Sequence, residues 1–428
     1  MLDQDQKQVG LADLETVGRN SSRLLHPGLR VVLEKLTRRE TLTDDNLQLL
    51  FRQIAELERR AQDRQGKPAC NALLADAAEV RAFVSGHATR DGTERIMGRS
   101  GKGSIGFYRA VQDICLSSVG IGTFRGAIDA ETDASYAAAV HAALGLGVNI
   151  VDTSLNYRQQ HSERAVGTGL RRHFEMSGGR RDEIVVCTKG GYLVAGAVTP
   201  GTLEAEEIVS GTHSMAPSFL SDQIDRSRRN LGLETIDVYY LHNPEVQLRT
   251  VDVKTFMARI GAAFEKLEGA VSDGLIRYYG TATWNGYRDG TLALSTLAEI
   301  ARRIAGENHH FRFVQMPFNL CMQEAIRPLL GFAGSFVDLA AELGIAVIAS
   351  APLLQGRLSR DLPHELAKML PALVTDCQRA IQFARSAPGI TSALVGMRTA
   401  EHVADSLRIA GIAPLTPAEY KHLQSAGF

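Results

Sequence analysis

The stretch VNIVDTSLNYRQQHSERAVG, residues 148–167, shows the pattern from which the fold can be predicted. It begins with the apolar run of a buried strand, which ends at Asp152. Tyr157 follows five positions later, and a charged segment of helical composition comes next. A strand that is covered on both faces and leads into a helix is typical of a parallel βα unit. We therefore expect such a unit here, with polar side chains where the strand ends.

The same unit recurs along the chain. Eight short runs have strand composition, and at least one stretch of helical composition separates each run from the next. Eight βα repeats over about 310 residues favour a closed (β/α)8 barrel, the α/β fold of the TIM type, over an open doubly wound sheet. No G-x-G-x-x-G motif follows the first run, which also argues against the open sheet. The runs are SSVGIG, VNIVDT, EIVVCTK, IDVYYLH, IRYYGTAT, RFVQMP, IAVIASAP and TSALVG.

Three regions of the chain differ in composition. Residues 1–90 contain amphipathic segments and are predicted to form a helical N-terminal region. Residues 91–106 are rich in glycine, serine and charge, so they are predicted to be a linker. The barrel is predicted over residues 107–428, with FYRAVQDICLS forming a hairpin across its bottom. An insertion at about residues 191–217 follows the third strand, and a connection of that length is usually functional or disordered.

Composition narrows the classes of function. The 428 residues carry a formal net charge of -1, which gives no general attraction to nucleic acid or to an anionic membrane. No apolar run approaches the roughly 20 residues of a spanning helix, and the N-terminus lacks the layout of a signal peptide. The five cysteines lie far apart, without the spacing of metal ligands. We expect a cytoplasmic protein without a metal, whose partner is a small molecule.

Candidate catalytic residues stand at the ends of consecutive strands. Asp152, Lys189 and His242 end the second, third and fourth runs, and Tyr157 lies in the loop after Asp152. In a barrel of this type the carboxyl ends of the strands form one active-site face, so the four side chains are predicted to converge. A nearby ammonium lowers the pKa of a tyrosine, and a carboxylate keeps the ammonium charged. Tyr157 is then predicted to be a proton donor near neutral pH.

Each of these residues has an ordinary structural alternative. An aspartate at a strand end often caps the next helix, and a loop tyrosine can pack on the barrel rim. A lysine can end a strand in solvent, and a single histidine is more often structural than catalytic. The combination of the four groups at neighbouring strand ends favours the catalytic interpretation.

An ordered set of segments resembles the signature segments of the aldo-keto reductase family, over about residues 110 to 410. The resemblance implies a (β/α)8 barrel that binds NADP(H), or less often NAD(H), without a Rossmann domain. It implies that Tyr157 protonates the carbonyl oxygen as hydride arrives, that Lys189 lowers the pKa of Tyr157, that Asp152 pairs with Lys189, and that His242 orients the substrate oxygen. The segments are VNIVDTSLNY, HSERAVGTGL, VVCTKGG, LGLETIDVYYLHNPE, SDGLIRYYGTATW, FVQMPFN, IAVIASAPLLQGRL and ALVGMRTAEHVADSL.

The resemblance also implies positions that bind the nicotinamide. The family's Ser-Asn pair after the fifth strand is replaced by Ala282 and Thr283, so Thr283 and Gln315 are the candidate ligands of the carboxamide. Ser350 occupies the place where the family often has an aromatic ring that stacks on the nicotinamide. Trp284 could supply a ring instead, or could pack in the core. Further candidate cofactor contacts at the end of the first strand are Gly122 and Thr123.

The remaining cofactor positions concern the phosphates and the adenine. The loop after the seventh strand keeps the family's P-L-x-x-G pattern, and the loop after the eighth strand is predicted to place an anion at a helix N-terminus. Arg398 suits a 2′-phosphate, so NADP(H) is favoured over NAD(H), with a solvated loop charge as the alternative. The candidates are Pro352, Leu353, Gln355 and Gly356 for the pyrophosphate, Arg398 and Thr399 for the anion, and His402 and Ser406 near the adenine.

The insertion and the N-terminal region have less definite roles. The insertion follows Lys189 and is predicted to contribute to the substrate pocket, with His213 and Met215, and also Trp284, as candidate contacts. A metal at His213 is not expected, because no companion ligand stands at suitable spacing. The N-terminal helices are predicted either to pack on the barrel or to form a contact between copies in a homo-oligomer.

Three functions remain open from the sequence. The first is an oxidoreductase that transfers hydride between NADP(H) and an aldehyde, ketone or sugar, or the corresponding alcohol. The second is a regulatory or sensor protein that binds the nucleotide on the same barrel with little turnover. The third is a barrel enzyme in which Lys189 forms a Schiff base, against which Asp152 at pairing distance would keep Lys189 charged.

Overall fold

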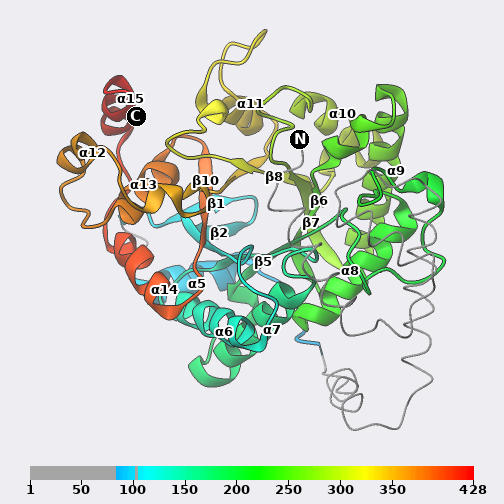
Figure 1. The fold of residues 1–428 in the computed structure, drawn as a ribbon, viewed down its shortest axis with the longest axis horizontal. Helices are drawn as coiled ribbons and strands as arrows, with labels where there is room; N and C mark the ends of the chain where they lie inside the picture. The colour runs from blue at the N-terminus through cyan, green and yellow to red at the C-terminus, as the bar shows by residue number, and fades with distance from the viewer. Residues whose placement is uncertain (1–82, 102–104) are drawn as a thin grey trace, which may run out of the picture. The chain divides into compact units, whose positions relative to one another are not determined.

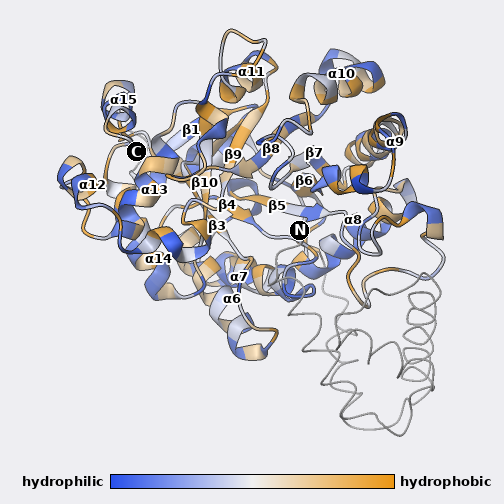
Figure 2. Ribbon diagram, turned by 45° about the horizontal axis from the view of Figure 1, so that its top comes forward, coloured by the Kyte–Doolittle hydropathy of each residue, from blue (hydrophilic) through white to orange (hydrophobic). Residues whose placement is uncertain are grey.

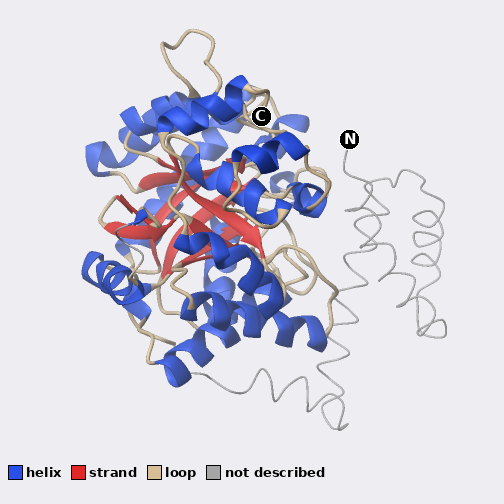
Figure 3. Cartoon of the chain, turned by 90° about the vertical axis from the view of Figure 1, so that its left-hand side faces the viewer, coloured by secondary structure: helices blue, strands red, loops and turns tan. Residues whose placement is uncertain are grey.

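The computed structural model describes residues 83–101 and 105–428, and the helices predicted within residues 1–82 lie outside this part. Its centre is a closed barrel of eight parallel strands surrounded by helices (Figures 1 and 3). The strands follow one another around the barrel in chain order, and the last pairs with the first, which confirms the predicted fold. The strands are β3 (Val119–Gly122), β4 (Ile150–Asp152), β5 (Val185–Gly190), β6 (Ile236–His242), β7 (Ile276–Ala282), β8 (Phe311–Pro317), β9 (Ala346–Ser350) and β10 (Ile390–Gly396).

The helices cover the outside of the barrel with one apolar face each. In α9, for example, Phe256, Ile260, Phe264 and Leu267 recur at helical spacing and are buried, whereas polar residues face outward. Figure 2 shows the same division, with orange and blue on opposite sides of the outer helices. Within the described residues the helices are α5 (Arg90–Ser100), α6 (Ala130–Gly145), α7 (His161–Ser177), α8 (Pro217–Leu231), α9 (Val253–Ser272), α10 (Leu294–Ala305), α11 (Phe336–Glu342), α12 (His364–Met369), α13 (Asp376–Ser386), α14 (Ala400–Ser406) and α15 (Pro417–Ser425).

The apolar core has two layers, one inside the barrel and one between the strands and the helices. Ile150 and Val185 belong to the inner cluster, whereas their neighbours Val151 and Val186 belong to the outer one. Successive side chains of a strand point to opposite faces, so both faces of each strand are buried. This explains why the sequence shows continuous apolar runs rather than alternation.

A two-stranded hairpin closes the amino end of the barrel. It consists of β1 (Tyr108–Val111) and β2 (Ile114–Ser117), which pair antiparallel and confirm the predicted hairpin. Ile114 and Leu116 are buried in the inner cluster of the barrel. The turn residue Asp113 accepts a hydrogen bond from the Tyr278 hydroxyl at 2.5 Å and pairs with a neighbouring arginine of β7.

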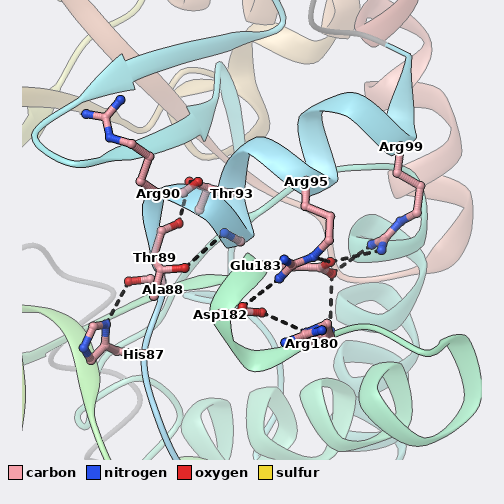
Figure 4. Close-up of polar contacts among 11 residues, drawn as sticks. His87, Ala88, Thr89, Arg90, Thr93, Arg95, Arg99, Arg180, Asp182 and Glu183 are labelled. Atoms are coloured by element: carbon pink, nitrogen blue, oxygen red, sulfur yellow. Dashed lines mark hydrogen bonds and ion pairs between the residues drawn. The ribbon is translucent and has the colours of Figure 1, made fainter.

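The prediction of a linker at residues 91–106 is wrong, because most of that stretch is the helix α5. The Thr89 hydroxyl caps the helix by accepting a hydrogen bond from the Gly92 amide. A Cβ atom at Gly92 would lie 2.0 Å from the backbone oxygen of Asp182, so glycine permits close packing here. Arg95 contacts Glu183 at 3.0 Å, and a second arginine one turn later does the same, as Figure 4 shows. The glycine and the charged residues that suggested a linker therefore allow α5 to pack on the segment that contains Asp182 and Glu183.

Residues 83–89, predicted to belong to the N-terminal region, contact the barrel directly. The backbone of Val84 pairs with the segment that precedes β6, and the Ala88 amide donates to Asp237 at 2.7 Å. Asp237 also accepts from Arg181 at 2.7 Å, and both side chains of this ion pair are at most 5% exposed. The compact unit that contains the barrel accordingly begins at Ala82.

The long connection between β5 and α8 is anchored at its base. Tyr192 pairs with His213 across the two ends of the loop, and the Ser214 amide donates to the Gly191 carbonyl at 2.8 Å. Farther out, Gln223 of α8 donates to the Ala197 carbonyl at 2.6 Å. The connection therefore has defined contacts with the barrel mouth and with α8.

Candidate active site

Four predicted residues converge at the carboxyl ends of the strands. Asp152 ends β4, Lys189 lies near the end of β5 and His242 ends β6. The Lys189 Nζ lies 2.6 Å from Asp152 Oδ1, 2.8 Å from the Thr153 carbonyl oxygen and 3.2 Å from the Tyr157 hydroxyl. The parallel strands end at one face of the barrel, and this shared end brings the groups together.

His242 lies beside the tyrosine. The ring centroids of His242 and Tyr157 are 5.9 Å apart, with the planes at 77°. The Ser154 hydroxyl lies 3.3 Å from His242 Nδ1. The ring of Phe124, in the loop after β3, contacts Tyr157 edge-on at 4.9 Å. The phenol is thus bordered by an ammonium, an imidazole and an aromatic ring.

Burial and charge set the protonation states of the site. Burial alone would lower the pKa of Lys189, but the Asp152 carboxylate reverses this and the pKa is raised, so Lys189 is an ammonium. Burial lowers the pKa of His242 well below 6.5, and Lys189 adds to the effect, so the imidazole is neutral. Burial raises the pKa of Tyr157, and Lys189 offsets only part of the rise. Lys189 therefore lowers the Tyr157 pKa as predicted, but burial outweighs this effect, and the phenol keeps its proton at neutral pH.

The backbone after Tyr157 is strained, which the sequence did not reveal. Residues 158–160 all have positive φ, at 49°, 51° and 75°, although none is glycine. Arg158 holds this turn, because its side chain donates to the Ala127 carbonyl at 2.8 Å and to Asp133 at 2.5 Å. Left-handed non-glycine residues cost on the order of 1–3 kcal/mol each and persist where contacts enforce them. The turn fixes the position of Tyr157 over Lys189.

The predicted carboxamide ligands lie at the ends of β7 and β8. Gln315 Nε2 donates to Asp152 Oδ2 at 2.8 Å, which ties this position to the catalytic group. The Thr283 hydroxyl donates to Glu245 and accepts from the Gly286 amide, which lies 2.7 Å away. Glu245 therefore supports Thr283, a role that sequence reasoning missed although Glu245 stands only three positions after His242.

The first and seventh strands of the barrel deliver the other predicted contacts near the nicotinamide position. Gly122 ends β3, and the buried Thr123 after it donates its hydroxyl to the Asp152 carbonyl at 3.2 Å. The hydroxyl of Thr123 is thus used within the protein. Ser350 ends β9 and is partly exposed, with its backbone oxygen accepting from the Phe318 amide at 3.0 Å.

The loop after β9 has an irregular backbone. Gln355 and Gly356 have φ of 58° and 91°, and both are exposed, whereas Pro352 is buried and Leu353 partly buried. The Gln355 amide oxygen accepts a hydrogen bond from Arg125, which lies in the loop after β3. This contact joins two loops that flank the end of β10, the strand between β9 and β3 in the barrel.

Of the residues predicted to contact the anion and the adenine, some are exposed and one is buried. Arg398 and His402 are exposed, and the Thr399 hydroxyl caps α14 by accepting from the His402 amide at 3.3 Å. Ser406 is only 3% exposed, and its hydroxyl lies 3.8 Å from the sulfur of Cys377. The Ser406 side chain therefore faces the interior, and its predicted place near the adenine stays a prediction.

Several groups at the mouth of the barrel are chemically suited to a nicotinamide cofactor. A Cβ atom at Gly356 or at Gly396 would meet no atom within 4 Å, so space is open beside the loops after β9 and β10. Gln315 and Thr283 provide amide and hydroxyl groups of the kind that a carboxamide recognises. Arg398 is an exposed cation beside the same loops.

The predicted substrate contacts His213 and Met215 are buried instead. His213 is fully buried, with its Nε2 2.8 Å from the His242 carbonyl oxygen and its Nδ1 2.9 Å from the Gln247 amide nitrogen. Burial lowers the pKa of His213 to about 4, so the ring is neutral. Met215 is 2% exposed and belongs to the outer core. Neither is placed to touch substrate, and His213 instead supports the backbone of His242.

Asn243, Tyr192 and Phe124 lie at the mouth of the barrel together with Trp284, although the sequence analysis did not single them out. Trp284 is 37% exposed, so it is not core packing, and its backbone amide donates to Asn243 Oδ1 at 2.8 Å. Tyr192 meets His242 edge-on, with the ring centroids 5.1 Å apart. Phe124 is 45% exposed on the loop after β3. Asn243 and Tyr192 could have been found from the sequence, because Asn243 directly follows His242 and Tyr192 directly follows Gly191.

The part of the chain that the structure describes shows neither a metal cluster nor a membrane-spanning helix. Over 83–101 and 105–428, no cluster of three or more His, Cys, Asp or Glu side chains is arranged to hold a metal ion. Among the helices of the same residues, none combines the length and apolarity needed to cross a membrane.

The fold and the site define an oxidoreductase barrel of a known class. The chain belongs to the aldo-keto reductase family, since residues 118–427 match the model described as "Aldo/keto reductase family". It is accordingly an NAD(P)-dependent oxidoreductase that acts on a small molecule. The match covers the barrel strands from β3 onward and ends just after α15.

Two relatives among known proteins are similar over much of the chain. A "6-dehydroglucose reductase" of Novosphingobium aromaticivorans is 27% identical over 254 residues, which is 58% of this chain and 68% of the relative. The "Uncharacterized oxidoreductase YqkF" of Bacillus subtilis is 22% identical over 338 residues, covering 73% of this chain and 93% of the relative.

Solved structures show the same fold. The aldo-keto reductase AKR11C1 from Bacillus halodurans, in its holo form, aligns with a TM-score of 0.53 at 22% identity, over 74% of this chain and 95% of its own. The glycerol dehydrogenase AKR11B4 from Gluconobacter oxydans gives 0.55 at 20%, over 74% and 94%. An aldo/keto reductase from Klebsiella pneumoniae, in complex with NADP and acetate, gives 0.51 at 19%, over 73% and 92%.

Proposed function

We propose that this protein transfers hydride between NADP(H) and a carbonyl or alcohol substrate, an aldehyde, a ketone or a sugar, with Tyr157 as the general acid and base. The observation that carries the proposal is the position of the Lys189 Nζ, 2.6 Å from Asp152 and 3.2 Å from the Tyr157 hydroxyl. The same ion pair keeps Lys189 protonated, which argues against a Schiff base.

In the proposed mechanism each side chain handles a proton or a charge. The nicotinamide, when bound, supplies or accepts the hydride. The Tyr157 phenol gives its proton to the carbonyl oxygen, and the Lys189 ammonium stabilises the phenolate that results. Asp152 holds Lys189 in place through their 2.6 Å contact. His242 is neutral, its Nδ1 lies 3.3 Å from the Ser154 hydroxyl, and its Nε2 is the ring nitrogen left to orient the same carbonyl oxygen.

The preference for NADP(H) rests on Arg398. Its guanidinium is exposed beside the capped start of α14, where it is free to make bidentate contacts with a 2′-phosphate. Gln315 and Thr283 would hold the carboxamide, and the relative from Klebsiella pneumoniae contains NADP in its structure.

A titration followed by an activity assay tests the function. The purified chain is titrated with NADPH and with NADH while nicotinamide fluorescence is followed, and turnover is then measured with aldehydes, ketones and sugars. The proposal predicts binding of NADPH and reduction of at least one carbonyl class. Binding without reduction of any carbonyl would favour a nucleotide sensor, since Ala282 and Ser350 already depart from the usual ligands.

Arg398→Ala tests the cofactor preference. Loss of a charge-assisted contact to phosphate is worth roughly 1.5–3 kcal/mol, so the Kd for NADPH is expected to rise about tenfold or more. The Kd for NADH is expected to change less than about twofold. Equal losses for both nucleotides would remove Arg398 from the 2′-phosphate site. Arg408, an exposed arginine farther along the same segment, serves as the control for loss of surface charge.

A further inference from the structure

Tyr192 presents a second phenol to the active site. It follows β5 by two residues, and its ring meets His242 edge-on, with centroids 5.1 Å apart and planes at 89°. His242 therefore lies in ring contact with both Tyr157 and Tyr192. The proposed mechanism uses the Tyr157 phenol only, and Tyr192 has no part in it.

The direction of the hydrogen bond at Tyr192 can be deduced from its neighbours. The backbone amide of Trp284 is only a donor, and it lies 2.8 Å from Asn243 Oδ1. This contact fixes the Asn243 side chain with its nitrogen toward Tyr192, 2.9 Å from the phenol oxygen. The amide nitrogen is also only a donor, so Tyr192 accepts this bond. The phenol proton is not used by Asn243 and can be donated elsewhere.

The backbone of Asn243 is built to hold this arrangement. Asn243 has φ 47° and ψ 57°, a left-handed conformation that asparagine tolerates better than most residues. Its amide donates to the Ala282 carbonyl at 2.7 Å, which anchors it between the ends of β6 and β7. Asn243 thereby connects the end of β6, where His242 stands, with Tyr192 and Trp284.

The surroundings of Tyr192 indicate what the proton is donated to. Tyr192 is partly exposed, and burial raises its pKa, so it is a phenol and a donor at neutral pH. Phe124 and Trp284 are 45% and 37% exposed and offer apolar faces at the same mouth. Because the ring centroids of Tyr192 and His242 are 5.1 Å apart, a substrate whose carbonyl is held at His242 is expected to lie near Tyr192 as well.

We propose that Tyr192 is a specificity-determining residue that donates a hydrogen bond to a hydroxyl group on the carbon next to the substrate carbonyl, so that the enzyme prefers α-hydroxy aldehydes or ketones and, in reverse, vicinal diols. This inference rests on the proposed function. No covalent step is added, because Tyr192 only positions and selects the substrate.

The test compares two aldehydes that differ in their hydroxyl groups. D-Glyceraldehyde and propionaldehyde both have three carbons, and the latter lacks the hydroxyls. Tyr192→Phe removes the donor and keeps the ring contact with His242. The kcat/KM for glyceraldehyde is expected to fall about tenfold or more, while that for propionaldehyde and the Kd for NADPH change less than about twofold.

A second variant tests the hydrogen-bond direction without removing the phenol. Asn243→Asp keeps an acceptor for the Trp284 amide and tolerates the left-handed backbone. It places a carboxylate against Tyr192, which then donates its proton to that carboxylate instead of to substrate. The same selective loss for glyceraldehyde is expected, and its appearance in this variant supports the proposal even if Tyr192→Phe folds poorly.

The outcomes are distinguishable. An equal loss for both aldehydes would overturn the inference, because it would assign Tyr192 to the support of His242. No loss for either aldehyde would also overturn it. Failure of the unmodified protein to reduce either aldehyde or any other carbonyl would contradict the proposed function itself.

Discussion

The two ends of the barrel each contain a buried ion pair, and only one is suited to catalysis. At the amino end Arg181 and Asp237 are 2.7 Å apart, and at the mouth Lys189 and Asp152 are 2.6 Å apart. All four side chains are at most 5% exposed. The pairs are thus alike in distance and burial, so neither property indicates chemistry by itself.

The difference lies in what surrounds each pair. Asp237 also accepts from the backbone amides of Ala88 and Val186, and Arg181 also donates to two backbone carbonyls, so that pair is enclosed by the backbone. Lys189, in contrast, makes its third contact with the Tyr157 hydroxyl, a titratable group that is only partly buried. A buried charge becomes catalytic here because an exchangeable proton lies next to it.

The largest expected effect tests whether the two buried ion pairs differ in function. Lys189→Met is expected to lower kcat by about a hundredfold to ten-thousandfold, because the phenolate loses its stabilising charge. Arg181→Met is expected to leave the kcat of folded protein unchanged. Either variant leaves a buried carboxylate unpaired, so both are expected to lower the free energy of unfolding by about 3–5 kcal/mol. Kinetics and urea unfolding of both variants measure this, and equal kcat losses would contradict the comparison.

The rates of carbonyl reduction and of alcohol oxidation are expected to depend on pH in different ways. The pKa of Tyr157 is raised, so the phenol needed for reduction persists through neutral pH and is lost only above the raised pKa. Alcohol oxidation needs the phenolate, so its rate is expected to rise about tenfold per pH unit below that pKa. His242 is neutral well below pH 6.5, so it adds no inflection near that pH. Rate profiles in both directions check this, and an oxidation rate that falls with rising pH would refute it.

The smallest effect concerns the docking of α5 at the amino end. Burial opposes ionisation of Glu183, but Arg99 and Arg95 lower its pKa overall. A lowered pKa means that the pair stabilises the fold above the unfolded pKa of about 4.3, and that this is lost as pH falls through the folded pKa. Glu183→Gln is expected to cost about 1–2 kcal/mol, because both arginines are partly exposed, and to leave kcat unchanged. Thermal unfolding at pH 7 and at acidic pH measures it, and a larger pH dependence in the variant would contradict it.

The sequence was sufficient for the features that depend on strand order. Continuous apolar runs separated by helical segments predicted the barrel, and the polar residues at the ends of the second, third and fourth runs predicted the meeting of Asp152, Lys189 and His242. These inferences succeeded because parallel strands share one carboxyl end, so position along a strand fixes position at the site.

The features that the sequence did not predict correctly depend on contacts between segments that lie far apart in the chain. The helix α5 was predicted to be a linker because its stretch is rich in glycine, serine and charge, whereas its Gly92 packs on Asp182, 90 positions away. His213 was assigned to substrate because it lies in the insertion after Lys189, whereas it is buried against Gln247 on another loop. The net pKa of Tyr157 required the degree of burial, and the left-handed turn at residues 158–160 required the anchoring of Arg158 to Asp133.

One comparison of variants tests the central claim most directly, namely that Tyr157 is the proton donor. Tyr157→Phe is measured beside Tyr420→Phe, a control in which an equally aromatic but remote and buried phenol is removed. The account predicts that Tyr157→Phe loses about a hundredfold to ten-thousandfold in kcat for carbonyl reduction while its Kd for NADPH stays within about twofold, and that Tyr420→Phe retains both values. A Tyr157→Phe variant with normal kcat would contradict the assignment of the acid.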